Sequence, residues 1–148
     1  MHFKKRLCFF ILAPKKLAAD NQSVVINEIA WMGTTISANN EWIELRNLTS
    51  NEIVLDGWTL QAVDGSPQIN LSGQITSNGY YLLERTDDNA VPSVSADMIY
   101  IGALGNNGEN LVLKDNNGNV IDQVDASAGL PAQAGWPAGD NTTKQTME

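Results

Sequence analysis

Residues 39–47 read NNEWIELRN, and apolar and polar side chains alternate along them. Successive side chains of a β-strand point to opposite faces of the sheet, so Glu41 shares a face with Ile43 and Leu45. Glu44 lies on the opposite face. We therefore predict a strand whose inner face contributes Ile43 and Leu45 to an apolar core, and whose two glutamates point away from each other.

The same two-residue period recurs along the chain between turns rich in Asn, Gly, Asp and Pro. The predicted strands lie within residues 24–31, 41–47, 53–63, 68–73, 80–86, 98–103, 110–115 and 120–125. In the first of them, strict alternation puts Val24, Ile26, Glu28 and Ala30 on one face. The sequence shows no helical period of useful length. These patterns predict an all-β protein, an immunoglobulin-like antiparallel β-sandwich of about nine strands.

Three interruptions of the period predict local features. Gly57 breaks the third apolar stretch and predicts a bulge or bend. Residues 86–96, which read TDDNAVPSVSA, predict a longer loop. Asn117 and Gly118 separate two apolar segments and predict a β-hairpin with a type I′ turn, because that turn needs positive φ at both central residues.

The composition excludes several classes of site from most of the chain. The only histidine is His2 and the only cysteine is Cys8, so residues beyond Asp20 cannot form a Ser-His-Asp, Cys-His or histidine-ligated metal site, and no disulfide can form within the chain. From Asp20 onward the chain carries four basic residues against all 17 acidic ones, a formal net charge of −13. So acidic a surface repels phosphate groups, and nucleic-acid binding is not expected.

Residues 1–22 have the features of a secretory signal. Basic residues come first, the apolar run Leu7–Ala13 follows, and the small residues Ala18 and Ala19 end the segment. We expect cleavage after Ala19 and an extracytoplasmic or secreted location. The apolar run is far shorter than the ~20 residues that span a bilayer, so no transmembrane span is expected. The alternative is a disordered, basic N-terminal extension.

Three glutamates close to tryptophans raise the hypothesis of a glycosidase. Such enzymes hold two carboxylates roughly 5–9.5 Å apart in a substrate cleft, and only Glu28 with Glu44 could form this pair, because Glu41 lies on the other face. A small sandwich has little concave surface to hold a sugar ring. We therefore interpret the glutamates as structural, with Glu44 placed to exchange charge with Arg46, and Glu28 placed to bind loop amides or Arg46.

Six segments carry a family resemblance: VVINEIAW (24–31), NEWIELRN (40–47), VLDGWTL (54–60), GYYLLER (79–85), LVLKDNNGNVIDQV (111–124) and GWPAGDNTTKQTME (135–148). In this order they resemble a lamin tail domain, the immunoglobulin-like module of nuclear lamins that also occurs in bacterial extracytoplasmic proteins. The resemblance makes residues 23–148 one domain after the leader 1–22. It implies an interaction or adhesion module without known catalysis. No coiled-coil heptads precede the domain, so filament assembly does not carry over.

The tryptophans have different expected roles. Trp58 shares a strand face with Leu60 and is predicted to fill the core, whereas Trp31 and Trp42 are expected to pack beside loops. The chain beyond residue 125 is rich in Ala, Gly and Pro and is expected to be irregular, with Trp136 packing it back onto the sandwich. An exposed tryptophan would suit a bound sugar.

A calcium site is a further alternative. Counted from Asp115, the segment DNNGN lacks the Gly and Glu that an EF-hand loop needs, which leaves a weaker oxygen-lined site among Asp87, Asp88, Asp97 or Asp115. The leading hypothesis is a non-catalytic interaction or adhesion module that binds a protein or cell-envelope component. The second is a carbohydrate- or calcium-dependent binding domain, and the third is a hydrolase. No catalytic, cofactor-binding or metal-ligating residue is assigned.

Overall fold

The computed structural model describes residues 22–126 and 135–148, and the predicted cleavage site lies outside them. These residues form ten strands: β1 (Val24–Ala30), β2 (Trp42–Asn47), β3 (Ile53–Val54), β4 (Thr59–Ala62), β5 (Gln68–Asn70), β6 (Gln74–Ile75), β7 (Tyr80–Arg85), β8 (Met98–Tyr100), β9 (Asn110–Lys114) and β10 (Val120–Asp125). The described residues contain no helix of the length and apolar character needed to cross a membrane.

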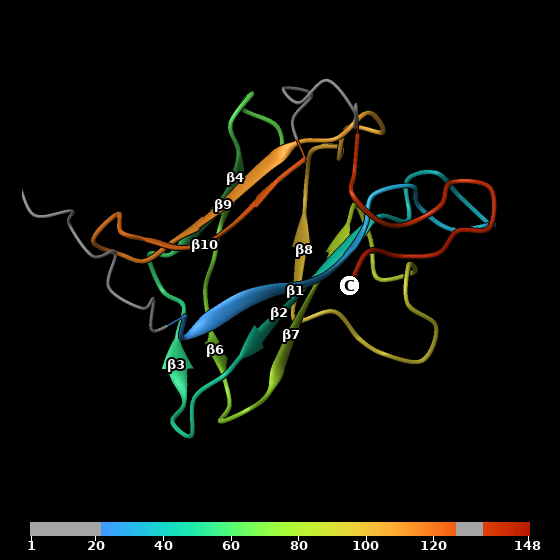
Figure 1. The fold of residues 1–148 in the computed structure, drawn as a ribbon. Helices are drawn as coiled ribbons and strands as arrows, with labels where there is room; N and C mark the ends of the chain where they lie inside the picture. Colours follow the sequence, from blue (N-terminus) through green and yellow to red (C-terminus); the bar gives the residue numbers. More distant parts are fainter. Residues whose placement is uncertain (1–21, 127–134) are drawn as a thin grey trace, which may run out of the picture.

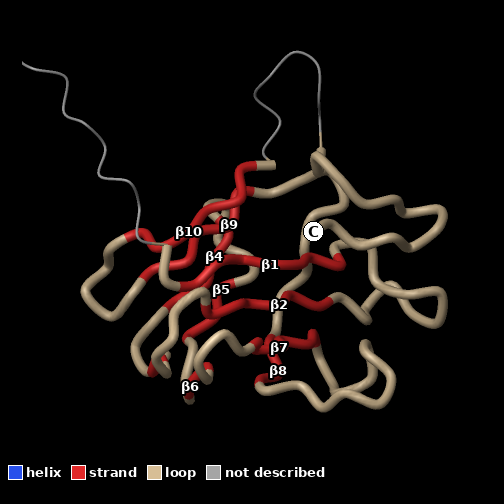
Figure 2. Tube along the Cα trace, turned by 60° about the horizontal axis from the view of Figure 1, so that its bottom comes forward, coloured by secondary structure: helices blue, strands red, loops and turns tan. Residues whose placement is uncertain are grey.

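The strands form two four-stranded sheets and a small third one (Figure 1). One sheet has the order β1-β2-β7-β8, the second has the order β10-β9-β4-β5, and β3 pairs with β6. Figure 2 shows the strands of the first sheet one below the other, beside those of the second. The all-β immunoglobulin-like sandwich is confirmed.

One strand pair departs from the predicted antiparallel arrangement. β8 runs parallel to β7, with Leu83 opposite Met98 and Arg85 opposite Tyr100. A parallel pair needs a connection of about a dozen residues, because the chain must return to the end where the first strand began. Residues 86–97 provide that length. The predicted loop is therefore confirmed, and it is a crossover.

The core lies between the two large sheets and follows the predicted alternation. Ile43 and Leu45 on β2 are fully buried, and Trp58, Leu60 and Ala62 are buried in or beside β4. The buried apolar residues belong to one cluster, with five exceptions: Ala30, Leu82, Ala90, Val112 and Ala126. The inner faces of both sheets thus supply a single apolar core, which is the main source of stability in a sandwich.

A β-bulge in β1 corrects the predicted placement of Glu28. Ile26 lies opposite Leu45, but Glu28 lies opposite Glu44, so Asn27 is an extra residue in β1. Two residues of β1 oppose one of β2 there, which reverses the side-chain alternation. Val24, Ile26 and Ile29 therefore point inward. Glu28 points outward, on the same face as Glu44.

Gly57 marks a change of sheet. It has φ of 82°, which a residue with a Cβ rarely adopts, and it separates β3 from β4. β3 belongs to the small sheet and β4 to the second large one. The predicted bend is confirmed, and it carries the chain from one sheet to another.

The hairpin between β9 and β10 is confirmed, but its turn type was predicted wrongly. Gly118 has φ of 81°, while Asn117 is not among the residues with positive φ. The amide of Gly118 donates to the carbonyl of Asp115, so the turn centres on Asn116 and Asn117, with Gly118 after it. Asp115 Oδ1 accepts from the amides of Asn117 and Asn119 and stabilises this longer turn.

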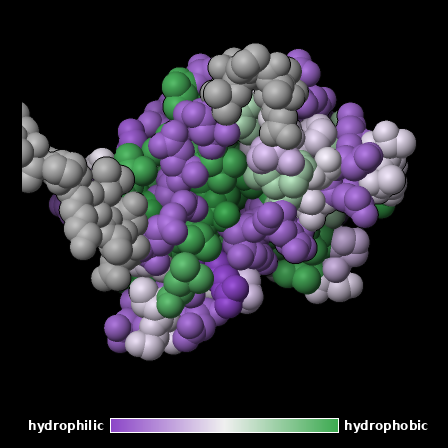
Figure 3. All heavy atoms as spheres, viewed as in Figure 1, coloured by the Kyte–Doolittle hydropathy of each residue, from purple (hydrophilic) through white to green (hydrophobic). Residues whose placement is uncertain are grey.

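The two large sheets meet at a seam between β1 and β10. There the amide of Ile26 donates to Asp122 Oδ2 at 2.7 Å, and Gln22 Nε2 donates to Asp122 Oδ1 at 2.6 Å. Figure 3 shows apolar atoms along this seam with hydrophilic residues on either side. A single carboxylate thus satisfies a backbone donor that a neighbouring strand would otherwise bind.

Residues 135–148 lie along the far end of β1. Ile29 and Met147 exchange two backbone hydrogen bonds, and the ring of Trp136 stacks on that of Trp31 at 6.2 Å between centroids. Trp136 Nε1 also donates to the carbonyl of Gly105 at 2.7 Å. The prediction that Trp136 packs the irregular end of the chain onto the sandwich is confirmed.

Candidate functional site

The outer face of β2 and β7 gathers the polar and aromatic side chains that the alternation excludes from the core. Directly opposed residues of neighbouring strands share a face, and Trp42 opposes Glu84, as Glu44 opposes Leu82. Arg46 opposes Tyr80 farther along. The outer face thus alternates rings, carboxylates and one cation across two strands.

A hollow of about 270 Å³ lies on this face. Its lining residues come from β2, β7 and the crossover between β7 and β8: Trp42, Glu44, Tyr80, Leu82, Val91, Val94, Ser95 and Asp97. The floor is the sheet itself and one wall is the crossover loop. The lining therefore combines apolar surface with two carboxylates.

Buried Glu84 holds the crossover loop against the sheet. Its Oε2 accepts the amide of Ala90 at 2.7 Å and its Oε1 accepts the amide of Val91 at 2.9 Å. Asp97 Oδ2 accepts the amide of Leu82 at 2.8 Å, which fixes the other end of the loop. Hydrogen bonds to a carboxylate are stronger than those between neutral groups. The wall of the hollow is therefore fixed by the protein's own side chains.

Glu44 on β2 is partly exposed, whereas Glu84 on β7 is fully buried. Asn27 Nδ2 donates to Glu44 Oε1 at 2.8 Å. Partial burial raises the pKa of the Glu44 carboxyl, the bond from Asn27 lowers it, and the nearby charges of Glu28 and Glu148 raise it further. Negative charge is thus concentrated around this side of the hollow.

The charge exchange predicted between Glu44 and Arg46 takes another form. The guanidinium of Arg46 lies over the ring of Tyr80, 5.3 Å from its centroid, in a cation–π contact. Its charge lowers the pKa of Glu44, but the ion pair found in residues 22–126 and 135–148 joins Arg85 to Glu41. Glu28 accepts the hydroxyl of Thr146, not a loop amide or Arg46.

A second hollow of about 350 Å³ lies on the other side of Trp42. Its lining also includes residues from the end of β1, the loop that follows it, the crossover loop and the segment 135–148. These residues are Ala30, residues 33–36, Ala90, Pro92, Thr143, Lys144 and Thr146. Trp42 thus lines both hollows. The prediction that Trp42 packs beside loops is confirmed.

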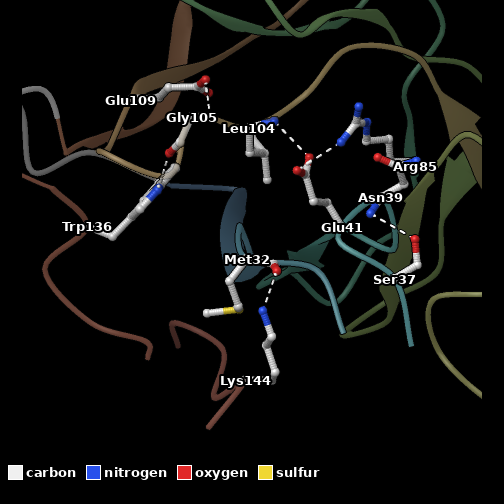
Figure 4. A network of polar contacts seen from close by, with 10 residues as sticks. All are labelled: Met32, Ser37, Asn39, Glu41, Arg85, Leu104, Gly105, Glu109, Trp136 and Lys144. Carbon is white, nitrogen blue, oxygen red and sulfur yellow. Dashed lines mark hydrogen bonds and ion pairs between the residues drawn. The ribbon is translucent and has the colours of Figure 1, made fainter. Parts of the chain in front are cut away.

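The inner end of β2 holds a different cluster, in which two consecutive amides bind two buried carboxylates (Figure 4). Glu41 Oε2 accepts the amide of Leu104 at 2.8 Å, and Glu41 Oε1 pairs with Arg85 at 3.0 Å. Glu109 Oε1 accepts the amide of Gly105. The residues between β8 and β9 are therefore held at the end of the sandwich by the side chains of Glu41 and Glu109, which directly precede β2 and β9.

Burial has the largest effect on the pKa values of the two glutamates in this cluster. It raises the pKa of Glu109 to about 7, although the bond from the Gly105 amide lowers it. It also raises the pKa of Glu41, against the opposing effects of the Leu104 amide and Arg85. Within the described residues, Glu109 Oε2 and the hydroxyl of Tyr100 have no hydrogen-bond partner. Glu109 was not predicted as a site residue, because nothing in its immediate sequence neighbours marks it as buried.

The alternative sites predicted from the sequence are not brought together. Among the described residues no group of three or more His, Cys, Asp or Glu side chains could hold a metal ion. Asp88 accepts the amide of Ala96, Asp97 that of Leu82, and Asp115 those of its own turn. Each of these aspartates serves local loop structure.

The proposed glycosidase pair lies on one face without sharing a cleft. Glu28 and Glu44 are opposed across β1 and β2. Only Glu44 of the two lines either hollow beside Trp42. A retaining or inverting pair needs both carboxylates directed at one bound sugar. The arrangement therefore does not match that chemistry.

Comparison with known families gives a match. The family model described as Lamin Tail Domain matches residues 18–128, which is most of the chain and includes all ten strands. The matched range ends before residues 135–148. None of the curated proteins matches the chain.

Proposed function

Because the chain belongs to the lamin tail domain family, an immunoglobulin-like family of protein-interaction modules, we propose that it is a non-catalytic module that binds a protein or cell-envelope partner. The domain in this proposal spans residues 23–148. Binding would use the outer face of β2 and β7, with Trp42 at its centre.

The hollow beside Trp42 is the observation that carries this proposal. Binding sites on proteins are concave, mostly apolar, and carry a few polar groups that orient the ligand. Five apolar or aromatic residues and two carboxylates line the hollow, and its loop wall is fixed by Glu84. Val94 and Tyr80 at its edge are each 52% exposed, so a partner could reach both.

The same face supports a non-catalytic role over the hydrolase hypothesis. A catalytic acid and base must approach one reacting atom, whereas Glu28 and Glu44 are bound to Thr146 and Asn27. The family is also a non-catalytic one. Screening the chain on chromogenic glycosides, esters and phosphodiesters tests this part. Turnover that disappears in Glu28→Gln or Glu44→Gln would overturn it.

Export is the second part of the proposal. It rests on the basic start and apolar run of residues 1–22, which are typical of a secretory signal. Mass spectrometry of the native protein should find a new N-terminus near Asp20. An intact Met1 on an envelope-located protein would contradict the proposal of a cleaved signal.

Two matched substitutions test the binding face. Val94→Arg places a long charged side chain on the wall of the hollow, while Val63→Arg makes the same change at a position that lines neither hollow beside Trp42. Val63 is 69% exposed and Val94 52%, so both variants should fold. Proteins captured from an envelope fraction by the wild type should be retained by Val63→Arg and lost with Val94→Arg. Equal capture by all three chains would show that binding uses another surface.

A carbohydrate-dependent function is the alternative, and the rings of Trp42 and Tyr80 in one hollow are what favours it. Aromatic rings stack on the apolar faces of sugars, and the carboxylates and Ser95 could accept or donate hydrogen bonds to hydroxyls. A glycan array with and without calcium separates this reading from protein binding. Specific glycan signals that Val94→Arg removes would favour it.

A further inference from the structure

We propose that the hollow beside Trp42 takes the lysine or arginine side chain of a basic segment of the partner protein. This inference rests on the proposed function, because it names the chemistry of the partner that binds the same face. The cationic head would lie between Glu44 and Asp97. Its methylene stem would lie against Trp42, Leu82 and the valines of the crossover loop.

The charge of the hollow is the first reason. Glu44 and Asp97 both line it, and each is bonded to a neutral donor, Asn27 Nδ2 or the Leu82 amide. The ion pair found in the described part of the chain is elsewhere, between Glu41 and Arg85. Glu28 and Glu148 add negative charge close to Glu44, since both raise its pKa. A cation that enters the hollow would therefore gain favourable interactions with carboxylates that no resident cation pairs with directly.

The shape and lining are the second reason. A hollow of about 270 Å³ has room for one long side chain and not for a folded element. Lysine and arginine bury their methylene groups on apolar surface and keep the charged head near water or a counter-charge. Trp42, Leu82, Val91 and Val94 offer that apolar surface. The lining thus matches both parts of such a side chain.

Arg46 provides an example within the same sheet face. Its guanidinium already lies over the ring of Tyr80 at 5.3 Å, so a cation is accommodated on this aromatic surface. Arg46 does not line the hollow, and the cation–π contact found in the described residues uses the ring of Tyr80, not that of Trp42. Tryptophan has the ring that attracts cations most strongly. A second cation is therefore expected on the Trp42 side.

The fixed loop wall reduces the cost of binding. Glu84 binds the amides of Ala90 and Val91, and Asp97 binds that of Leu82. A site whose backbone is already ordered loses less conformational entropy when its ligand arrives. The acidic chain beyond Asp20 also attracts a basic segment over longer range and accelerates its association.

Calorimetric titration of the full chain with acetylated, amidated pentalysine tests the inference, with pentaserine as the uncharged peptide. Glu44→Gln removes one charge from the hollow, and Glu52→Gln removes one from an exposed site that binds Gln74 Nε2. We expect pentalysine to bind at least about tenfold more weakly to Glu44→Gln and within about twofold of wild type to Glu52→Gln. Melting curves of both variants confirm that they are folded.

Val94→Arg and Val63→Arg give a second, independent comparison. Binding of pentalysine should be lost with Val94→Arg, because the new arginine fills the hollow and repels the positively charged peptide. It should weaken only slightly with Val63→Arg. Equal losses in Glu44→Gln and Glu52→Gln, or equal losses in the two arginine variants, would show diffuse attraction to an acidic surface and would overturn the inference.

The outcome separates this inference from the proposed function. If wild type does not bind pentalysine but still captures an envelope protein in a way that Val94→Arg abolishes, the basic partner is excluded and the binding face stands. If capture is also insensitive to Val94→Arg, both are excluded. Binding of an oligosaccharide that Glu44→Gln leaves unchanged and Val94→Arg removes would replace the basic segment by a sugar.

Discussion

Glu41 directly precedes β2 and Glu44 lies within it, yet the first side chain is buried at the end of the sandwich and the second is partly exposed on the outer face. Glu41 is 4% exposed at the inner end of the sandwich, where it pairs with Arg85 and accepts the Leu104 amide. Glu44 is only partly buried on the outer face, where Asn27 is its donor and a hollow lies beside it.

The difference shows that the same type of side chain meets different surroundings on the two faces of one short segment. Inside the sandwich, a charge must be paired, because an unpaired buried carboxylate costs several kcal/mol. On the outer face water and neighbouring dipoles stabilise the charge, so Glu44 can remain without a direct cation and available to one from outside. For Glu41 and Glu44 the alternation of side chains along the chain decides which of the two situations applies.

The largest effect is expected at the inner end of the strand. Glu41→Ala leaves Arg85 and the Leu104 amide without their acceptor, and should lower the free energy of unfolding by about 3 kcal/mol. Urea unfolding followed by tryptophan fluorescence measures this. A loss below about 1 kcal/mol would mean that the inner end is hydrated, and the comparison with Glu44 would fail.

Glu84 tests whether burial or sheet face controls the cost. It lies on the outer face opposite Trp42 but is buried under the crossover loop, where each of its oxygens accepts one amide. Glu84→Gln replaces one acceptor by a donor and should cost about 2 kcal/mol. Hydrogen exchange should be faster at the amides of Ala90 and Val91 than in wild type. Unchanged exchange there would show that the loop is held by other contacts.

Glu109 adds a pH dependence, because burial raises the pKa of its carboxyl well above the ordinary value. Its pKa is raised from 4.5 to about 7 in the folded chain, so between these values the folded state holds a proton that the unfolded state has released. The free energy of unfolding should therefore fall as pH rises from about 4.5 to about 7, with no further contribution from this group above that range.

Glu109→Gln isolates this contribution because it removes the titration and keeps the size of the side chain. At pH 8 the variant should be more stable than wild type by on the order of 1–2 kcal/mol, and below pH 4.5 the two should be alike. Chemical unfolding at several pH values measures the difference. A constant difference across the whole pH range would contradict the raised pKa.

The smallest effect on stability is expected for Glu44→Gln. The side chain is partly exposed and surrounded by like charges from Glu28 and Glu148, so loss of its charge relieves repulsion while the bond to Asn27 can persist. The free energy of unfolding should change by less than about 0.5 kcal/mol. The melting temperature should therefore stay nearly the same or rise slightly. A large loss would place Glu44 with Glu41 as a structural carboxylate and remove the contrast between the two faces.

Much of the fold could be predicted from local pattern, and the errors occur where distant segments decide. The alternation in β2 correctly separated Ile43 and Leu45 from Glu44. It failed in β1, because a bulge at Asn27 is a feature of the pairing with β2 and has no marker in the alternation itself. The parallel pairing of β8 was missed for the same reason. An apolar run shows that a strand exists, but not the direction of its neighbour.

The candidate site was predictable only in part. From the sequence, Glu28, Trp42 and Glu44 were residues of interest, and the glutamates were interpreted as structural. Nothing in the sequence predicts that Val94 or Asp97 lies near Glu44. Their shared hollow depends on the crossover loop folding back over β7, where Glu84 holds it. Glu109 gave no signal at all, because its burial depends on how residues between β8 and β9 close the end of the sandwich.

By itself the sequence determined the fold class, the inner and outer faces of β2, the acidic charge of the chain and the absence of histidine and cysteine from residues beyond Asp20. These properties depend on composition or on a two-residue period, which neighbouring residues specify. The tertiary structure alone decided that Glu28 faces outward, that β8 runs parallel to β7, and that Glu44 and Asp97 line one hollow. Each of these depends on register or on loop closure between distant segments, and the free energies that select them arise from contacts that form only when the sheets assemble.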